Sequence, residues 1–266
     1  MTALTAAPPS APARLPLGTE ERTFVARSMR HTIRNVESLL MAIVLPVMLM
    51  LLFVYVFGTA ISPDGQYVNY VVPGIILLCA GFGASSTGVD VANDSATGFM
   101  DRLRTMPVRS SAVITGHVVA SLARNLAATA IVIGVALAIG FRPTASAGEW
   151  VAAIALVALY ILTITYLFAA IGLASGNPEA ANGYGFILLF LPYLSSAFVP
   201  TETLPTWLRG VAEHQPITPV IESIRGLLTG VESGNAPLVA VAWCVGILVV
   251  AVTWSTIMFR RKAGRR

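Results

Sequence analysis

Six long apolar segments, separated by short polar connections, are the feature that most restricts the fold of this chain. They cover residues 39–60, 70–91, 117–140, 150–174, 182–199 and 237–259. An α-helix needs about 20 consecutive apolar residues to cross the roughly 30 Å hydrocarbon core of a bilayer. Lipid offers no hydrogen-bond partner to the backbone, so such segments must be helical. The sequence therefore predicts an all-α integral membrane protein with six transmembrane helices.

The composition supports this class. Hydrophobic residues make up 56% of the 266 positions and charged residues only 11%, with a mean hydropathy of +0.76. Soluble domains average about 25% charged residues. We expect one membrane domain over residues 20–260, between a disordered, Ala/Pro-rich cytoplasmic tail (1–19) and a basic cytoplasmic tail (261–266). Cys79 and Cys244 lie in apolar runs, and we expect no disulfide.

Positive charge is distributed unequally between the connections. With the N-terminus inside, 13 of the 17 Lys and Arg residues fall on the cytoplasmic side, 3 on the outer side, and Arg124 within a span. Cytoplasmic loops of membrane proteins carry such an excess of Lys and Arg. The sequence predicts that both termini are cytoplasmic, which also accounts for the net charge of +4 without nucleic acid as a partner.

Two segments outside the spans have helical periodicity on the predicted cytoplasmic side. Residues 20–38 alternate an apolar with an arginine-bearing face, typical either of a helix lying on the membrane surface or of a plain basic segment. Residues 93–110 are polar, and an amphipathic helix is predicted there from Thr97 to Met106, ended by Pro107. Its residues are Thr97, Gly98, Phe99, Met100, Asp101, Arg102, Leu103, Arg104, Met106 and Pro107.

Two ionisable residues fall inside the spans. Asp90 lies near the cytoplasmic end of the second span, and Arg124 lies about two turns into the third span from the same side. Each charge alone costs about 2.5–3.5 kcal/mol at mid-membrane on insertion scales. We expect them to form a buried charge pair, with a structural tie favoured over a role in gating or substrate contact.

Small residues and prolines mark several positions within the spans. Gly81, Gly83 and Gly88, with the serines between them, make a surface suited to close helix packing rather than pore lining. Pro192 lies inside the predicted fifth span, where it can kink a helix.

The predicted outer segment 200–237 is divided by prolines into short pieces. Two short helices are expected, at 206–213 and 218–228, and neither is long enough to span. They suggest a helical hairpin dipping into the outer leaflet and capping an exit path, with an ordered surface loop as the alternative. The residues assigned to this hairpin, which the family resemblance given below makes an outer gate, are Pro205, Trp207, Pro216, Glu222 and Arg225.

Motifs for chemistry are missing from this sequence. The only lysine is Lys262, and no GxxxxGK[ST] motif surrounds it, so we expect any ATP to bind elsewhere. His31, His117 and His214 lack metal-ligand spacing, and the serines of residues 83–88 do not form GxSxG. The sequence predicts neither catalytic residues, nor a bound cofactor, nor a metal site.

Several segments together resemble one family. The run 98–109 followed by Gly116 is similar to the segment after the second span in type-2 ATP-binding-cassette (ABC) exporters, especially permease subunits of the daunorubicin-resistance type. Residues 205–208 and 216–225 resemble that family's external segment between the fifth and sixth spans. Arg34-Asn35, Pro46 and residues 72–74 fit its first two spans.

The resemblance implies a function and partners. Residues 97–107 would be the coupling helix that docks on a separate ABC nucleotide-binding subunit, present in two copies and supplying ATP and Mg, while this chain supplies no cofactor. Residues 20–38 would be an interfacial connecting helix. A second permease copy or paralogue would complete an exporter of amphipathic drugs or lipid-like substrates in the cell inner (cytoplasmic) membrane. The alternatives are an ion-coupled secondary transporter, which should carry more buried carboxylates, and a membrane enzyme or assembly factor.

Overall fold

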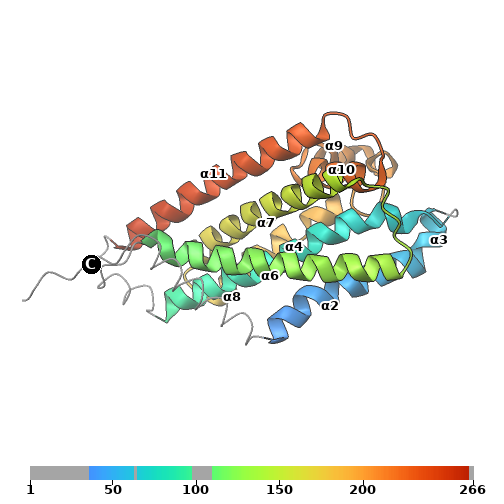
Figure 1. The fold of residues 1–266 in the computed structure, drawn as a ribbon. Coiled ribbons are helices and arrows are strands. Elements are labelled where there is room, and N and C mark those ends of the chain that lie inside the picture. Colours follow the sequence, from blue (N-terminus) through green and yellow to red (C-terminus); the bar gives the residue numbers. More distant parts are fainter. Residues whose placement is uncertain (1–35, 63–64, 98–109, 264–266) are drawn as a thin grey trace, which may run out of the picture.

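The computed structural model describes residues 36–62, 65–97 and 110–263 as a bundle of helices (Figure 1). At one end of the bundle α4 and α11 end and α6 begins; we call it the C-terminal end. The opposite end carries α9, α10 and the connections α3–α4, α6–α7 and α10–α11, and we call it the hairpin end (Figure 1). The predicted tail 1–19 and most of the predicted helix 20–38 lie outside the described residues.

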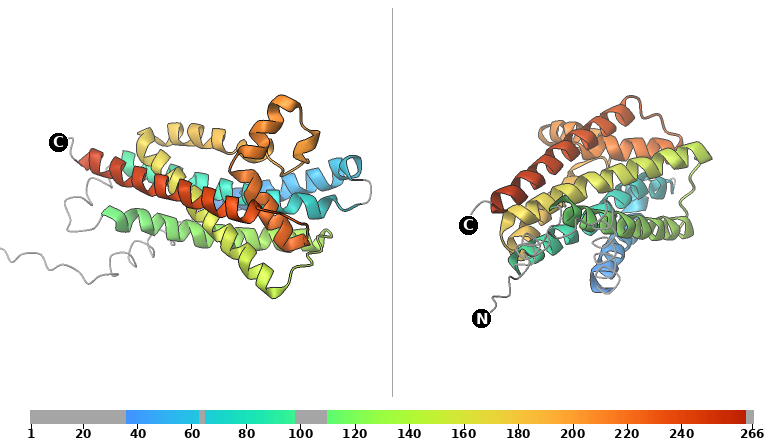
Figure 2. Two further views of the ribbon diagram at one scale, coloured as in Figure 1. Left: turned by 90° about the horizontal axis from the view of Figure 1, so that it is seen from above. Right: turned by 60° about the vertical axis from the view of Figure 1, so that its left-hand side comes forward.

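Helix α4 (Tyr67–Ala96) is the centre of the bundle. It contacts α2 (Val36–Leu52), α6 (Ser110–Ala138), α7 (Ala147–Ser175), α8 (Pro178–Leu188) and α10 (Ile217–Thr229). Helix α11 (Ala236–Ala263) packs outside α7 and α10 (Figure 2). An unbroken helix of 30 residues is about 45 Å long. α4 therefore links the two ends of the bundle as one rod.

Five helical segments are long and apolar enough to cross a membrane within the described residues: Ala42–Ile61, Tyr67–Ala96, Thr115–Ala138, Ala147–Ser175 and Ala236–Met258. They correspond to the first, second, third, fourth and sixth predicted spans. The first of them continues from α2 through a π-helical turn (Phe53–Phe57) into α3 (Gly58–Ile61).

The residues predicted as the fifth span do not form one continuous helix. α8 is only 11 residues long and ends at Leu188, and a 3₁₀ turn follows at Leu191–Leu194. Pro192 explains the break, because proline lacks an N–H and its ring clashes with the carbonyl four residues earlier. The structure thus replaces the predicted helix over 182–199 by a broken segment, and the count of six transmembrane helices stays a prediction.

Local signals in the sequence set the ends of α7 and α8. Ser146 caps α7 in a reciprocal capping box with Glu149, and Gly176 ends that helix in the left-handed conformation at φ 81°. Asn177 then caps α8, with Pro178 in its first turn. This Gly-Asn-Pro sequence reverses the chain at the C-terminal end of the bundle.

The small residues of α4 lie where neighbouring helices come close. A Cβ at Gly88 would meet the Phe168 carbonyl oxygen of α7 at 2.8 Å, and one at Gly83 would overlap the Asn125 amide of α6. Gly172 of α7 in turn faces the carbonyl of Gly88. These glycines therefore permit helix packing, the role favoured from the sequence.

Candidate functional site

The C-terminal end of α4 leads directly into the predicted coupling segment. Thr97 ends the helix, and its N–H and hydroxyl both donate to the Asn93 carbonyl. Gly98 to Pro107 lie outside the described residues, so the predicted helix there stays a prediction. Across the base of this segment His117 Nε2 of α6 lies 3.0 Å from Asp94 Oδ2 of α4. This contact joins the helices that enter and leave the segment.

A buried polar cluster crosses the middle of the bundle. Arg124, which is 5% exposed, donates through Nη2 to the Gly83 carbonyl at 2.7 Å. The same nitrogen donates to the hydroxyls of Ser86 (2.8 Å) and Thr87 (2.9 Å) on α4. Thr87 donates onward to Ser121 of α6 at 2.9 Å. Arg124 therefore fixes α6 to α4 mainly through neutral oxygen atoms.

Asp90, the predicted partner of Arg124, lies half-buried on α4 and interacts electrostatically with the guanidinium. The hydrogen bonds described above run from Arg124 to α4 oxygens one to two turns before Asp90. A direct ion pair between the two thus stays a prediction. That a glycine carbonyl and two hydroxyls share the arginine could not be predicted from the sequence.

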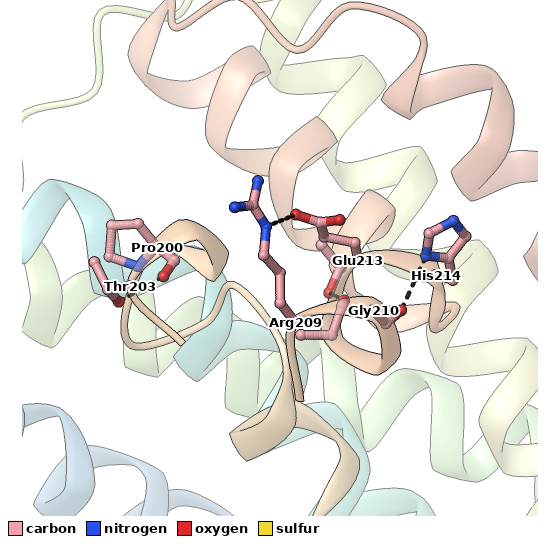
Figure 3. A network of polar contacts seen from close by, with 8 residues as sticks. Pro200, Thr203, Arg209, Gly210, Glu213 and His214 are labelled. Carbon is pink, nitrogen blue, oxygen red and sulfur yellow. Dashed lines mark hydrogen bonds and ion pairs between the residues drawn. The ribbon is translucent and has the colours of Figure 1, made fainter. Parts of the chain in front are cut away.

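Two short helices, α9 and α10, lie at the hairpin end. η3 (Thr201–Thr203) precedes α9 (Thr206–His214), for which Pro205 is the N-cap, and Pro216 is the N-cap of α10. Figure 3 shows the polar contacts of α9 and η3: Arg209 Nε donates to Glu213 at 2.7 Å, His214 Nδ1 lies 2.9 Å from the Gly210 carbonyl, and Thr203 donates to Pro200. Trp207 is 76% exposed. α9 is thus an exposed helix stabilised by its own side chains.

Helix α10, in contrast, is held by a buried arginine. Arg225 is 8% exposed and donates through Nη2 to the Ser196 carbonyl at 2.6 Å and through Nε to the Tyr70 carbonyl at 3.2 Å. Its guanidinium carbon lies 3.8 Å from the centroid of the Tyr70 ring. A planar guanidinium can hydrogen-bond and stack at the same time. Arg225 therefore connects α10, the start of α4 and the segment after the 3₁₀ turn Leu191–Leu194.

Three further hydrogen bonds close the hairpin end. Tyr67 donates its hydroxyl to the Phe198 carbonyl at 2.7 Å, and Gln215 Nε2 donates to the carbonyls of Leu191 (3.2 Å) and Leu194 (2.5 Å). The loop before α10 is thus tied to the broken segment, and that segment to α4.

Glu222 lies half-buried one turn before Arg225 on α10. Burial raises the pKa of this carboxyl above its usual value of 4.5, and the charge of Arg225 opposes that rise. Helical spacing relates Glu222 to Arg225, but it does not show that Arg225 is covered. Tyr70 and Ser196, which lie far from Arg225 in the chain, cover it in the folded bundle.

No three His, Cys, Asp or Glu side chains come together to hold a metal ion within residues 36–62, 65–97 and 110–263. Apolar helices of membrane-spanning length surround a central helix, and the buried polar groups join helices to each other. These features define a multi-pass membrane protein.

Comparison with known proteins identifies the family. The ABC-2 type transporter family matches residues 19–229, and the chain belongs to that family as a permease subunit. It is 26% identical over 243 residues to daunorubicin resistance ABC transporter permease protein DrrB1 of Streptomyces coeruleorubidus, covering 91% of this chain and 85% of that protein. It is 25% identical over 263 residues, covering 94% and 95%, to a protein named as probable doxorubicin resistance ABC transporter permease protein DrrC of Mycobacterium tuberculosis.

Proposed function

We propose that this permease moves an amphipathic drug or lipid-like substrate out of the cytoplasm or inner leaflet, driven by ATP hydrolysis in two copies of a separate nucleotide-binding subunit. The observation that carries the proposal is the family match over residues 19–229. The names of these relatives, which refer to daunorubicin and doxorubicin resistance, support the substrate class.

In this proposal residues 97–107 are the coupling helix on the nucleotide-binding subunit. Their place supports it, because the segment joins the central helix α4 to α6 and is closed at its base by the Asp94–His117 contact. A displacement of the segment would be passed to α4. The cytoplasmic position of this end, and of both termini, is part of the proposal and rests on the arginine distribution.

The hairpin end would act as the outer gate. Tyr70 lies in the first turn of α4, and its carbonyl and ring contact Arg225 of α10. Because α4 is one unbroken rod, movement at its C-terminal end can reach α10 through this contact. The arrangement supplies a physical link between ATP-driven movement and opening of the hairpin end, as a two-state transition requires.

The broken segment 178–199 would be the fifth of six membrane crossings. A Cβ at Gly185 would meet the Ser85 hydroxyl at 2.9 Å, and farther along the Phe198 carbonyl accepts from Tyr67. Ser85 and Tyr67 are 18 residues apart on α4, which is about 27 Å along a helix axis. The segment thus follows α4 over most of a bilayer core, which supports six crossings with a break in the fifth.

A second permease copy or a paralogue would complete the pathway. α8 exposes Tyr184 (57%), Phe186 (61%) and Ile187 (64%), α2 exposes Met48 (59%), and the π-helical turn after α2 exposes Tyr55 (65%). Both α8 and α2 flank α4. We propose these faces as the contact with the second permease, with lipid around the remaining spans.

Co-purification tests the partner. The permease, extracted in mild detergent from its own cells, should retain an ATPase, and changing Asp101, Arg102 and Arg104 together to Ala should remove that activity from the eluate. The matched control changes Arg209 and Glu213 of α9 to Ala, charged residues at the opposite end. Equal ATPase retention in both variants would contradict docking through residues 97–107.

Labelling tests the orientation. A single cysteine at position 102, in a chain with Cys79 and Cys244 changed to Ala, should react with a membrane-impermeant maleimide only after the membrane is opened. A cysteine at Trp207 should react in intact cells. The reverse pattern would overturn the whole scheme, including the reading of the hairpin end as an outer gate.

An ion-coupled carrier is not favoured by the family match.

A further inference from the structure

α6 and α7 separate toward the hairpin end and leave a groove in the membrane-spanning part of the bundle. Its volume is about 350 Å³, within the roughly 300–1,000 Å³ typical of small-molecule sites. The walls come from α6 and α7, and the floor from Ile76 of α4 and Leu228 of α10. The wall residues are Leu126, Thr129, Ala130, Ile133, Trp150, Ala153, Ile154 and Val157.

The depth of the groove follows from helix geometry. On α6 it extends from Leu126 to Ile133, and on α7 from Trp150 to Val157, about 10 Å along either axis. Ile133 lies five residues before the end of α6, and Trp150 three residues after the start of α7. The groove therefore occupies the half of the bilayer nearer the hairpin end, a leaflet of about 15 Å.

The lining chemistry matches hydrocarbon. Apart from the Thr129 hydroxyl and the Trp150 indole, every lining side chain is aliphatic. At the rim, Ile154 is 53% exposed. Trp150 lies nearest the end of the span, where the amphipathic indole of tryptophan is enriched at membrane–water interfaces. A groove of this kind accommodates acyl chains. It excludes polar groups, because it offers them too few hydrogen-bond partners to offset the loss of water.

The connection 139–146 crosses the hairpin end beside the groove and carries a cation. The N–H of Thr144 donates to the Leu228 carbonyl, which ties this loop to the groove floor. Arg142 is exposed on the loop, and its Nη1 donates to the Leu137 and Phe141 carbonyls at 3.0 Å, which hold the guanidinium at the end of α6 while its charge stays open to solvent. The Glu149 carboxylate accepts from the Ser146 N–H and hydroxyl. Positive charge is thus available at the level where phospholipid phosphates lie.

We propose that the α6–α7 groove binds one acyl chain of an anionic phospholipid whose headgroup lies at Arg142. In the orientation proposed above this is an outer-leaflet lipid, but the binding itself does not depend on that orientation or on the transported substrate. The bound chain fills the space between α6 and α7, so these helices keep their separation at the hairpin end.

Tryptophan quenching tests the site. In a chain with Trp207, Trp243 and Trp254 changed to Phe, Trp150 is the only tryptophan, and excitation at 295 nm reports on it without tyrosine. Dibrominated phosphatidylglycerol titrated into the detergent-solubilised protein should quench Trp150 along a saturating curve. The control is Val239→Trp with Trp150→Phe. Val239 is 43% exposed and lies three residues into α11 at the same end. Its quenching should rise in proportion to brominated lipid, as expected for non-specific contact.

Four substitutions decide between the outcomes. Ala153→Leu fills the groove, as does Ala130→Leu from its exposed rim; each should make the Trp150 curve proportional, whereas Ala152→Leu, on the neighbouring exposed position, should not. Arg142→Gln should raise the half-saturating lipid concentration about fivefold, the effect of one basic residue near an anionic surface. Identical curves for Trp150 and the Val239 control would overturn the site. An unchanged half-saturation in Arg142→Gln would overturn the assignment of an anionic phospholipid.

Discussion

Replacing Arg225 by Met is the sharpest test of how the hairpin end is held. The substitution keeps an unbranched apolar side chain but removes two charge-assisted hydrogen bonds, to Ser196 and Tyr70, and the stacking on the Tyr70 ring. Hydrogen bonds from charged donors contribute about 1.5–3 kcal/mol each, and a cation–π contact about 0.5–2 kcal/mol. These terms are not additive, and transfer of the buried guanidinium from water offsets part of them. We expect a net loss of about 2–4 kcal/mol.

Thermal unfolding of the purified permease in detergent measures this loss. At about 2–4 °C per kcal/mol for a chain of this size, Tm should fall by roughly 5–15 °C. Arg225→Lys should give an intermediate value, because an ammonium cannot bridge both carbonyls while stacking on the ring. Arg209→Met is the matched control: Arg209 belongs to the same hairpin, but its ion pair with Glu213 is exposed, so Tm should stay close to that of the wild type. Equal Tm values for Arg225→Met and Arg209→Met would refute the reasoning.

The remaining predictions concern helix contact, pH and the C-terminal end. Gly172→Ala should destabilise the protein by about 1–3 kcal/mol because its Cβ meets the Gly88 carbonyl of α4, whereas Gly134→Ala, with open space around it, should stabilise it by about 0.5–1 kcal/mol; unfolding midpoints compare the two. Because the pKa of Glu222 is raised in the folded state, its contribution to stability is present below the ordinary carboxyl pKa and is lost as pH rises through the raised value. Glu222→Gln should therefore gain Tm over the wild type as pH rises, and parallel Tm–pH curves would contradict the shift. His117→Ala should speed amide exchange in the last turn of α4 about fivefold, measured by mass spectrometry, with the loss of the Asp94 contact; unchanged exchange would show that this contact does not hold the segment.

The environments of the two buried arginines could be predicted from the sequence only in part. The sequence predicts that the charge of Arg124 is costly within a span. The structure buries this α6 side chain against α4. Its hydrogen-bond partners could not be predicted, because they depend on which turn of α6 faces the small-residue surface of α4 at Gly83. Arg225 gave a weaker signal, since helical spacing relates it to Glu222 but carries no information about Tyr70, 155 residues away.

The predicted fifth span shows a different limit. Hydropathy detects how apolar residues 182–199 are, and Pro192 was noted as a point where a helix can kink. Whether a proline bends a helix or ends it depends on whether neighbouring groups satisfy the freed backbone. Here α8 ends at Leu188, and the chain continues into a 3₁₀ turn that Gln215, just before α10, holds by a hydrogen bond.

The sequence by itself determined the class of this protein, because the hydrocarbon core of a bilayer requires long apolar helices and those are visible in composition and length. It also carried the family resemblance that the match over residues 19–229 established. Only the tertiary structure decided which helix is central, which oxygens hold the buried arginines and where α6 and α7 part to leave a groove. These features arise from contacts between residues far apart in the chain, and such contacts follow from the packing of whole helices rather than from local periodicity.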